Sequence, residues 1–267
     1  MNYHTEEWFD AQLQRHLEEA KKFNYNIFGL YYQGSGNYGL DYKGSDFDSV
    51  CIIIPSLSDI IRNSKPVSFT HIMENDEHIN FMDIRHWFEL LKKQNIQFLE
   101  LLWSVCFYQN SKYTNEWSHL TSQRETIARL DRAKHIKAIK GVALEKYHAL
   151  CKPFPSKLEI LEKFGYDPKQ LHHLMRLYDF LRDYISGNSY QSCLWVENPS
   201  LLVSVKEGRY KERYAKQIAE FTITNINALA ASEIENNKKE PNIELEKWLD
   251  NLIYDILYKS IYEETHN

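Results

Sequence analysis

The stretch that decides the fold is Gly34-Ser35-Gly36-Asn37-Tyr38-Gly39-Leu40-Asp41-Tyr42-Lys43-Gly44-Ser45-Asp46-Phe47-Asp48. It follows residues 26–33, which have the composition of a β-strand, and it runs into a second apolar strand over residues 46–54. Gly34 permits a sharp turn after the first strand, and backbone N–H groups near Ser35 can then face an anion. The stretch therefore predicts a phosphate-binding turn between two strands.

Two aspartates open the second strand. Ten residues separate Ser35 from Asp46, and Asp48 follows two positions later. Because side chains alternate along a strand, both carboxylates lie on one face, where their repulsion favours a bound cation. Magnesium prefers carboxylate and phosphate oxygens. We therefore predict a metal-dependent phosphoryl or nucleotidyl transfer site, with Asp46 and Asp48 as catalytic ligands of Mg²⁺ or Mn²⁺.

A third carboxylate usually completes such a site. Asp83 fits this role because it ends a predicted strand, residues 77–83, and a helix follows it. We predict Asp83 as the third catalytic and metal-binding residue, with Asp76 and Glu77 as weaker candidates. The spacing excludes the calcium loop of an EF-hand, and Lys43-Gly44-Ser45 does not have the order of a Walker phosphate loop.

The pattern of apolar residues divides the chain into two parts. Strands are predicted at 26–33, 46–54, 67–73 and 77–83, and helices at 5–23, 59–63, 84–94 and 96–107. After residue 110 the periodicity is helical, with helices predicted at 116–130, 132–151, 156–164, 168–186, 209–231 and 242–262. The prediction is an α+β fold: a small mixed β-sheet with flanking helices over 1–110, then an all-helical domain over 111–267.

Composition excludes several classes of protein. The 267 residues are 43% hydrophobic and 26% charged, with a net charge of −5, as in ordinary globular proteins. No apolar run approaches the roughly 20 residues that span a membrane, and residues 1–10 lack the pattern of a signal peptide. We expect a cytoplasmic protein with no membrane partner. Residues 124–157 hold nine Lys and Arg against three acids, a basic segment that fits either a polyanion or a solvated helix face.

The Gly-Ser turn and the Asp-x-Asp strand together resemble the signature of the DNA polymerase β-like nucleotidyltransferase superfamily. They are most similar to its predicted bacterial and phage group, whose pattern GSxxYGL…SDxD reads here from Gly34 to Leu40 and from Ser45 to Asp48. The similarity extends over about residues 30–230, through Asp83-Ile84-Arg85 and through the segment from Gly165 to Leu177. The chain departs from that group at Asn95-Ile96, where Asn-Pro is usual.

The resemblance implies a nucleoside triphosphate, with ATP expected, bound at Gly34, Ser35 and Ser45. It also implies nucleotide contacts from Lys169, His173 and Arg176, which fall at i, i+4 and i+7 on one stripe of a predicted helix. Without the resemblance, the same stripe fits a surface row of ion pairs with neighbouring aspartates. The resemblance further implies that the helical half covers the nucleotide.

The predicted function is transfer of a nucleoside monophosphate to an acceptor hydroxyl, with release of pyrophosphate. The acceptor is left open between RNA such as a tRNA end, a protein, and a small molecule. The alternative is a non-catalytic nucleotide-binding sensor, or a toxin-like regulatory module, that keeps the same fold.

Overall fold

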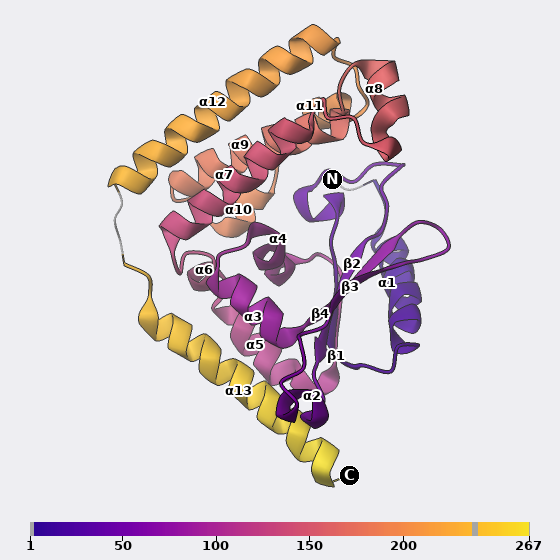
Figure 1. Cartoon of the computed structure of the whole chain (residues 1–267), viewed down its shortest axis with the longest axis vertical. Helices are drawn as coiled ribbons and strands as arrows, with labels where there is room; N and C mark the ends of the chain where they lie inside the picture. The colour runs from indigo at the N-terminus through magenta and orange to yellow at the C-terminus, as the bar shows by residue number, and fades with distance from the viewer. Residues whose placement is uncertain (1–2, 237–239, 267) are drawn as a thin grey trace. The chain divides into compact units, whose positions relative to one another are not determined.

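The Gly-rich stretch does connect two neighbouring strands. In a computed structural model, which describes residues 3–236 and 240–266, these strands are β1 (Asn26–Tyr32) and β2 (Ser49–Ile54) (Figure 1). They pair antiparallel, with Tyr32 opposite Ser49. The pairing brings the end of β1 and the start of β2 to one edge of a sheet.

The sheet is mixed and has five strands in the order β3-β4-β2-β1-β5. The other three strands are β3 (Ser68–Ile72), β4 (His78–Asp83) and β5 (Phe107–Gln109). β2 and β4 run parallel, and the other neighbours are antiparallel. This sheet, with helices around and after it, confirms the predicted α+β class.

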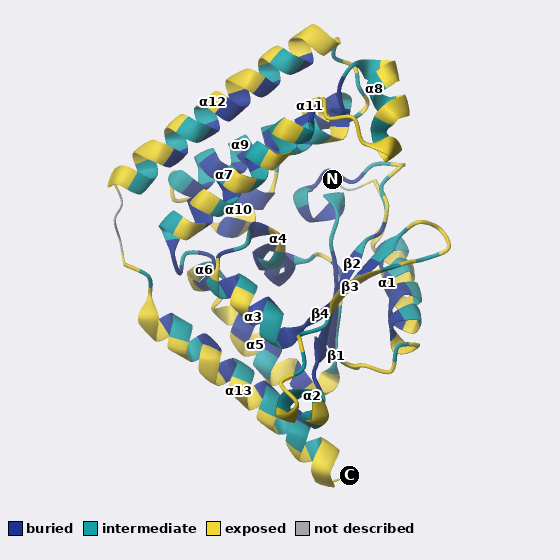
Figure 2. Cartoon of the chain, in the orientation of Figure 1, coloured by how far each residue is buried: buried dark blue, intermediate teal, exposed yellow. Residues whose placement is uncertain are grey.

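Helices cover both faces of the sheet (Figure 1). On one face, α1 (Glu6–Lys21) packs the apolar side chains Phe9, Leu13 and Leu17 against β1, β2 and Phe47. On the other face lie α3 (Ile84–Lys92) and α5 (Thr114–Ser122), whose tryptophans Trp87 and Trp117 contact Tyr31. Both faces of the central strands are therefore buried, as the dark blue strands in Figure 2 show.

Short helices make up most of the remaining connections. They are η1 (Ser35–Tyr38), α2 (Leu57–Ile61), α4 (Ile96–Leu99), η2 (Glu100–Trp103), η3 (Ser111–Tyr113), α6 (Arg124–Ile127), η4 (Pro155–Lys157), α8 (Leu158–Phe164), α10 (Tyr190–Leu194) and α11 (Pro199–Lys206). The long helices of the second half are α7 (Arg132–Ala149), α9 (Pro168–Ile185), α12 (Glu212–Asn236) and α13 (Ile243–His266). Among the short helices, α10 and α11 were not predicted.

The predicted helix over 96–107 is wrong in its second half. It ends at Trp103, and Phe107–Gln109 forms the edge strand β5 against β1. Three residues are too few for a visible period-2 pattern, and Cys106 already contributes a ladder bond through its carbonyl to the N–H of Tyr32.

The chain divides into two compact units, at boundaries that differ from the predicted ones. The first unit comprises residues 1–37, 41–131 and 241–267, and the second comprises 38–40 and 132–240. Helix α5, which follows residue 110, buries Trp117 against Tyr31 of the sheet and so belongs to the first unit. The last helix, α13, packs on α3 and so belongs to the sheet unit.

The second unit is built on three helices, α7, α9 and α12, that pack against one another. In α9, Asp167 caps the N-terminus and Pro168 occupies the first turn, as a helix start prefers. Its leucines at 171, 174, 177 and 181 are buried and recur at helical spacing. No helix in the described ranges is long and apolar enough to cross a membrane.

Candidate active site

The predicted phosphate turn is shaped by the tyrosine that ends β1. Tyr32 is fully buried, and its hydroxyl accepts a hydrogen bond of 3.1 Å from the Gly36 N–H. A Cβ atom at Gly34 would lie 2.3 Å from that hydroxyl, so only glycine fits there. Burial raises the pKa of Tyr32 to about 12, which keeps the hydroxyl neutral. The last residue of β1 therefore constrains the conformation of the turn through the Tyr32 hydroxyl.

Two serines join the ends of the Gly-rich stretch. The hydroxyls of Ser35 and Ser45 lie 2.9 Å apart, and the Ser45 hydroxyl also accepts the N–H of Tyr42 at 3.0 Å. Ser45 directly precedes Asp46. The bond between the serines therefore brings the predicted phosphate turn next to the predicted metal-binding carboxylates.

Asp46 and Asp48 flank Phe47 at the end of the Gly-rich stretch. They precede β2 rather than lie within it, since the strand begins at Ser49. Phe47, between them, is fully buried against α1, where its ring lies 4.8 Å from that of His16. An extended backbone over these residues would place both carboxylates away from α1. Asp46 is exposed, and the Asp48 side chain is 37% exposed.

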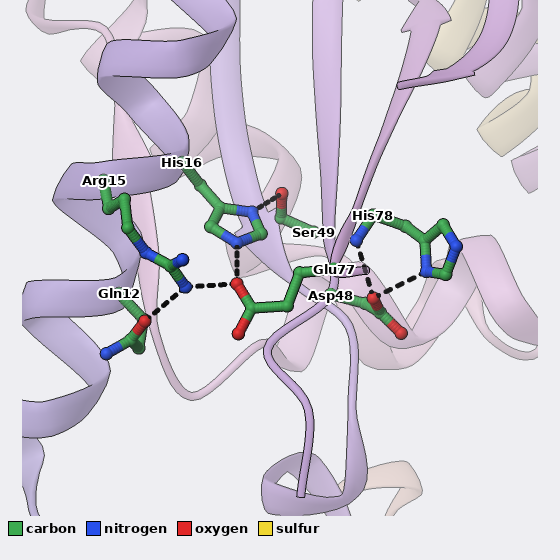
Figure 3. A network of polar contacts seen from close by, with 7 residues as sticks. All are labelled: Gln12, Arg15, His16, Asp48, Ser49, Glu77 and His78. Carbon is green, nitrogen blue, oxygen red and sulfur yellow. Dashed lines mark hydrogen bonds and ion pairs between the residues drawn. The ribbon is translucent and has the colours of Figure 1, made fainter. Parts of the chain in front are cut away.

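The neighbour of Asp48 on the adjacent strand is a histidine. The Asp48 carboxylate accepts the backbone N–H of His78 at 3.0 Å, and its Oδ1 lies 3.1 Å from the His78 ring nitrogen Nδ1 (Figure 3). The parallel register continues from here, with Ser49 opposite Ile79. His78 therefore occupies the position beside Asp48 where a third carboxylate was expected.

Asp83 does not lie at this edge. The register pairs it with Ile53, five residues further along β4 than His78, which is about 16 Å along a strand. Its side chain is 1% exposed and accepts three bonds from the Arg85 guanidinium, the shortest at 2.7 Å. It also caps the N-terminus of α3. We therefore do not retain Asp83 as the third carboxylate, because its place in the sheet gives it a structural role.

Asp83 instead borders a pocket at the opposite end of the sheet. This pocket has a volume of about 400 Å³, and Arg85, Asn26 and Ser260 of α13 also line it. Neither Asp46 nor Asp48 lines it.

Asp83→Asn is expected to lower the free energy of unfolding by about 1–3 kcal/mol, because the Arg85 guanidinium loses its charged partner. Any nucleotidyl transfer by the wild type should be retained by the folded variant. Urea unfolding followed by circular dichroism, beside an activity assay, checks both. Loss of transfer with unchanged stability would instead indicate that Asp83 is an active-site residue.

Glu77, a weaker candidate in the sequence, points to the other face of the sheet (Figure 3). It accepts a bond of 2.9 Å from His16 and pairs with Arg15, both on α1. Burial alone would raise the pKa of Glu77. The bonds from His16 and Asn75 and the charge of Arg15 together lower it by more, so the net shift is downward. His16 in turn bonds Ser49 at 2.9 Å. This network ties α1 to the start of β2 and β4.

Sequence reasoning missed both histidines of this region. His16 lies on the apolar face of α1 and is fully buried, a position that is typical of a core residue. His78 shows no motif, and only strand register reveals its place beside Asp48. Within the residues that the structure describes, no three His, Cys, Asp or Glu side chains are arranged as a metal centre.

The other predicted nucleotide contacts belong to the second unit. Lys169, His173 and Arg176 all lie on α9, as the helical spacing predicted, but they differ in exposure. Lys169 is exposed, His173 is half-buried, and Arg176 is 9% exposed. Burial lowers the pKa of His173 well below its usual value, and the charge of Arg176 lowers it further, so its ring is neutral.

Residues 7–153, more than half of the chain, match the RlaP family, described as the RNA repair pathway DNA polymerase beta family. No curated protein matches the sequence. Among solved structures, the chain is similar to a nucleotidyltransferase-like protein from Exiguobacterium sibiricum 255-15. The two are 12% identical with a TM-score of 0.31, and the match covers 83% of this chain and 74% of that one. The family match confirms the resemblance carried by the Gly-Ser turn and the Asp-x-Asp segment: the chain belongs to the RNA repair pathway DNA polymerase beta family.

Proposed function

We propose that this protein transfers a nucleoside monophosphate from a nucleoside triphosphate to a hydroxyl group of RNA. The observation that carries the proposal is the bond between Ser35 and Ser45, which brings the glycine-rich turn next to the segment that holds Asp46 and Asp48. In the reaction, the acceptor oxygen bonds to the α-phosphorus and the bond from that phosphorus to the β-phosphate oxygen breaks. Pyrophosphate leaves, and the hydroxyl proton passes to one of the two carboxylates.

The donor groups at this edge fit a divalent cation. Mg²⁺ is commonly held by one or two carboxylates together with substrate phosphates rather than by a complete protein cage. Asp46 and Asp48 supply two carboxylates, and both reach solvent. Mg²⁺ or Mn²⁺ bound there would neutralise the triphosphate and lower the pKa of the attacking hydroxyl. The His78 ring beside Asp48 offers a nitrogen atom as a further metal ligand.

The triphosphate, with ATP proposed as the nucleotide, is assigned to Gly34, Ser35 and Ser45 of the first unit. Lys169 and His173 of the second unit are proposed as additional contacts. Lys169 makes no ion pair within the described part of the chain, so its ammonium is available to a phosphate. Arg176 is assigned a different role below.

RNA is the acceptor that the family description and the charge pattern favour together. The family is named for an RNA repair pathway. Along α7, Lys134 and Lys137 are exposed on consecutive turns of the basic segment 124–157. Lysine side chains bind nucleic acids by neutralising backbone phosphates, so a row of positive charge along a helix supports RNA as the partner.

The test follows label from each α-³²P nucleoside triphosphate, with Mg²⁺ or Mn²⁺, into pooled RNA, lysate protein or small metabolites. We expect label in RNA with the wild type and with Asp255→Asn, an exposed control on α13. Asp46→Asn should give none. Label in protein or metabolites that depends on Asp46 would keep the chemistry and replace the acceptor.

A non-catalytic nucleotide sensor is the second candidate. It is favoured by one observation: His78, and not an acid, lies beside Asp48. Tight triphosphate binding with no transfer to any acceptor pool would select the sensor. Absence of both binding and transfer would contradict the site itself.

A further inference from the structure

Two adjacent residues of the phosphate turn are anchored in different units. The Asn37 side chain donates to the carbonyl of Tyr32 and accepts the N–H of Val105, each at 3.0 Å, which holds it to the sheet. The next three residues, 38–40, group with the helical unit. The chain then returns to the first unit at Asp41, whose carboxylate accepts the N–H of His4 at 2.7 Å.

Arg176 holds the first of those three residues. Its guanidinium carbon lies 3.8 Å from the centre of the Tyr38 ring, a close cation–π contact. Arg176 is 9% exposed, and such contacts are strongest where water is excluded. The aromatic face of Tyr38 is thus fixed on α9.

Gly39 provides a second attachment in the same segment. Its φ is +69°, and a Cβ atom there would lie 2.5 Å from the ring of Trp195. Glycine alone allows both this backbone conformation and this close approach. Tyr38 and Gly39 together dock the segment on the helical unit.

We propose that Arg176 is a positioning residue that, through Tyr38, holds the turn Gly34–Asn37 in the conformation that binds the triphosphate. A single planar peptide bond joins Asn37 to Tyr38, so the position in which Tyr38 is held limits the positions that Asn37 can take. A change in the seat of Tyr38 therefore displaces the turn. The functional half of this inference rests on the proposed nucleotide site.

Tyr38→Leu removes the aromatic face, whereas Tyr38→Phe keeps it. Hydrogen exchange of the amides of residues 33–45 should accelerate roughly fivefold to thirtyfold in Tyr38→Leu, the range that a buried cation–π contact provides. Tyr38→Phe should stay near the wild type. Since only the held form binds, the dissociation constant for a non-hydrolysable triphosphate should rise in Tyr38→Leu, by at most the same factor, and should stay near the wild-type value in Tyr38→Phe.

Arg176→Gln should behave like Tyr38→Leu in both measurements. Arg182→Gln is the matched control, because Arg182 lies on the same helix but pairs with Asp183 and Glu197 at the surface. Equal exchange and equal affinity in Tyr38→Leu and Tyr38→Phe would overturn the inference. Faster exchange in Tyr38→Leu, in a protein whose wild type binds no triphosphate, would support the positioning contact and contradict the proposed function.

Discussion

Asp48→Asn is expected to reduce nucleotidyl transfer by roughly a hundredfold to a thousandfold, the loss that follows removal of one preorganised charge-stabilising group. The substitution removes one negative charge from the pair that is proposed to hold the metal, and it changes almost nothing in shape. An Asn carbonyl can still accept the backbone N–H of His78, which Asp48 accepts at 3.0 Å in the wild type. The melting temperature should therefore stay within a degree or two of the wild type, since the side chain is 37% exposed.

Steady-state transfer and thermal melting are measured on the same preparation. Asp59→Asn is a suitable control, because Asp59 is a carboxylate of the same unit that caps α2 with Ser56, away from this edge of the sheet. It should retain transfer. Full transfer by Asp48→Asn would show that Asp48 is dispensable for catalysis, and unfolding of the variant would indicate a structural role instead.

The local part of this site was predictable because alternation along a strand depends only on neighbouring residues. Asp46, Phe47 and Asp48 show the pattern directly: the central side chain is buried, and the two carboxylates reach solvent. The Gly-Ser turn was predictable for the same reason. Gly34 and Tyr32 are close in sequence, and any residue larger than glycine at position 34 would meet the Tyr32 hydroxyl.

The residue beside Asp48 was not predictable, because its position depends on the register between two strands that are not consecutive in the chain. Asp83 ends its strand, as predicted, but β2 and β4 run parallel, so the end of β4 lies far from the start of β2. A sequence that places acids at both ends of a strand does not say which end meets Asp48. The structure assigns that position to His78.

The division into units was hidden for a similar reason. Helical periodicity reports which face of α13 is apolar but not which partner covers it, and the partner is α3 of the sheet unit. Likewise Tyr38 lies within the sheet's own motif, yet its ring packs on Arg176, far along the chain. Motif boundaries therefore do not coincide with unit boundaries.

Acidification is expected to destabilise the helical unit through His172. This ring is 4% exposed, and its Nδ1 bonds the carbonyl of Leu202 at 2.9 Å. Burial lowers its pKa to about 4; the bond to Leu202 opposes that shift, and the charges of Arg176, Lys206 and Lys169 add to it. In the unfolded chain the ring has its ordinary pKa of about 6.5.

The sign follows from which state binds the proton. Between about pH 6.5 and pH 4, the unfolded chain binds a proton at His172 that the folded chain does not. The contribution of this group is therefore complete above pH 6.5 and declines by up to about 1.4 kcal/mol per pH unit, for a total loss of about 3 kcal/mol near pH 4. Burial lowers the pKa of His16 and of His173 as well, so their effects have the same sign.

His172→Asn isolates this contribution, because the Asn amide can still donate to Leu202 but does not titrate. Urea unfolding at pH 7, 5.5 and 4.5 should show a shallower loss of stability in this variant than in the wild type. The difference in slope should approach one proton, or about 1.4 kcal/mol per pH unit. His148→Asn, at an exposed position on α7, is the control substitution. Equal slopes in His172→Asn and the wild type would mean that the ring is already protonated in the folded state, against the burial that keeps it neutral.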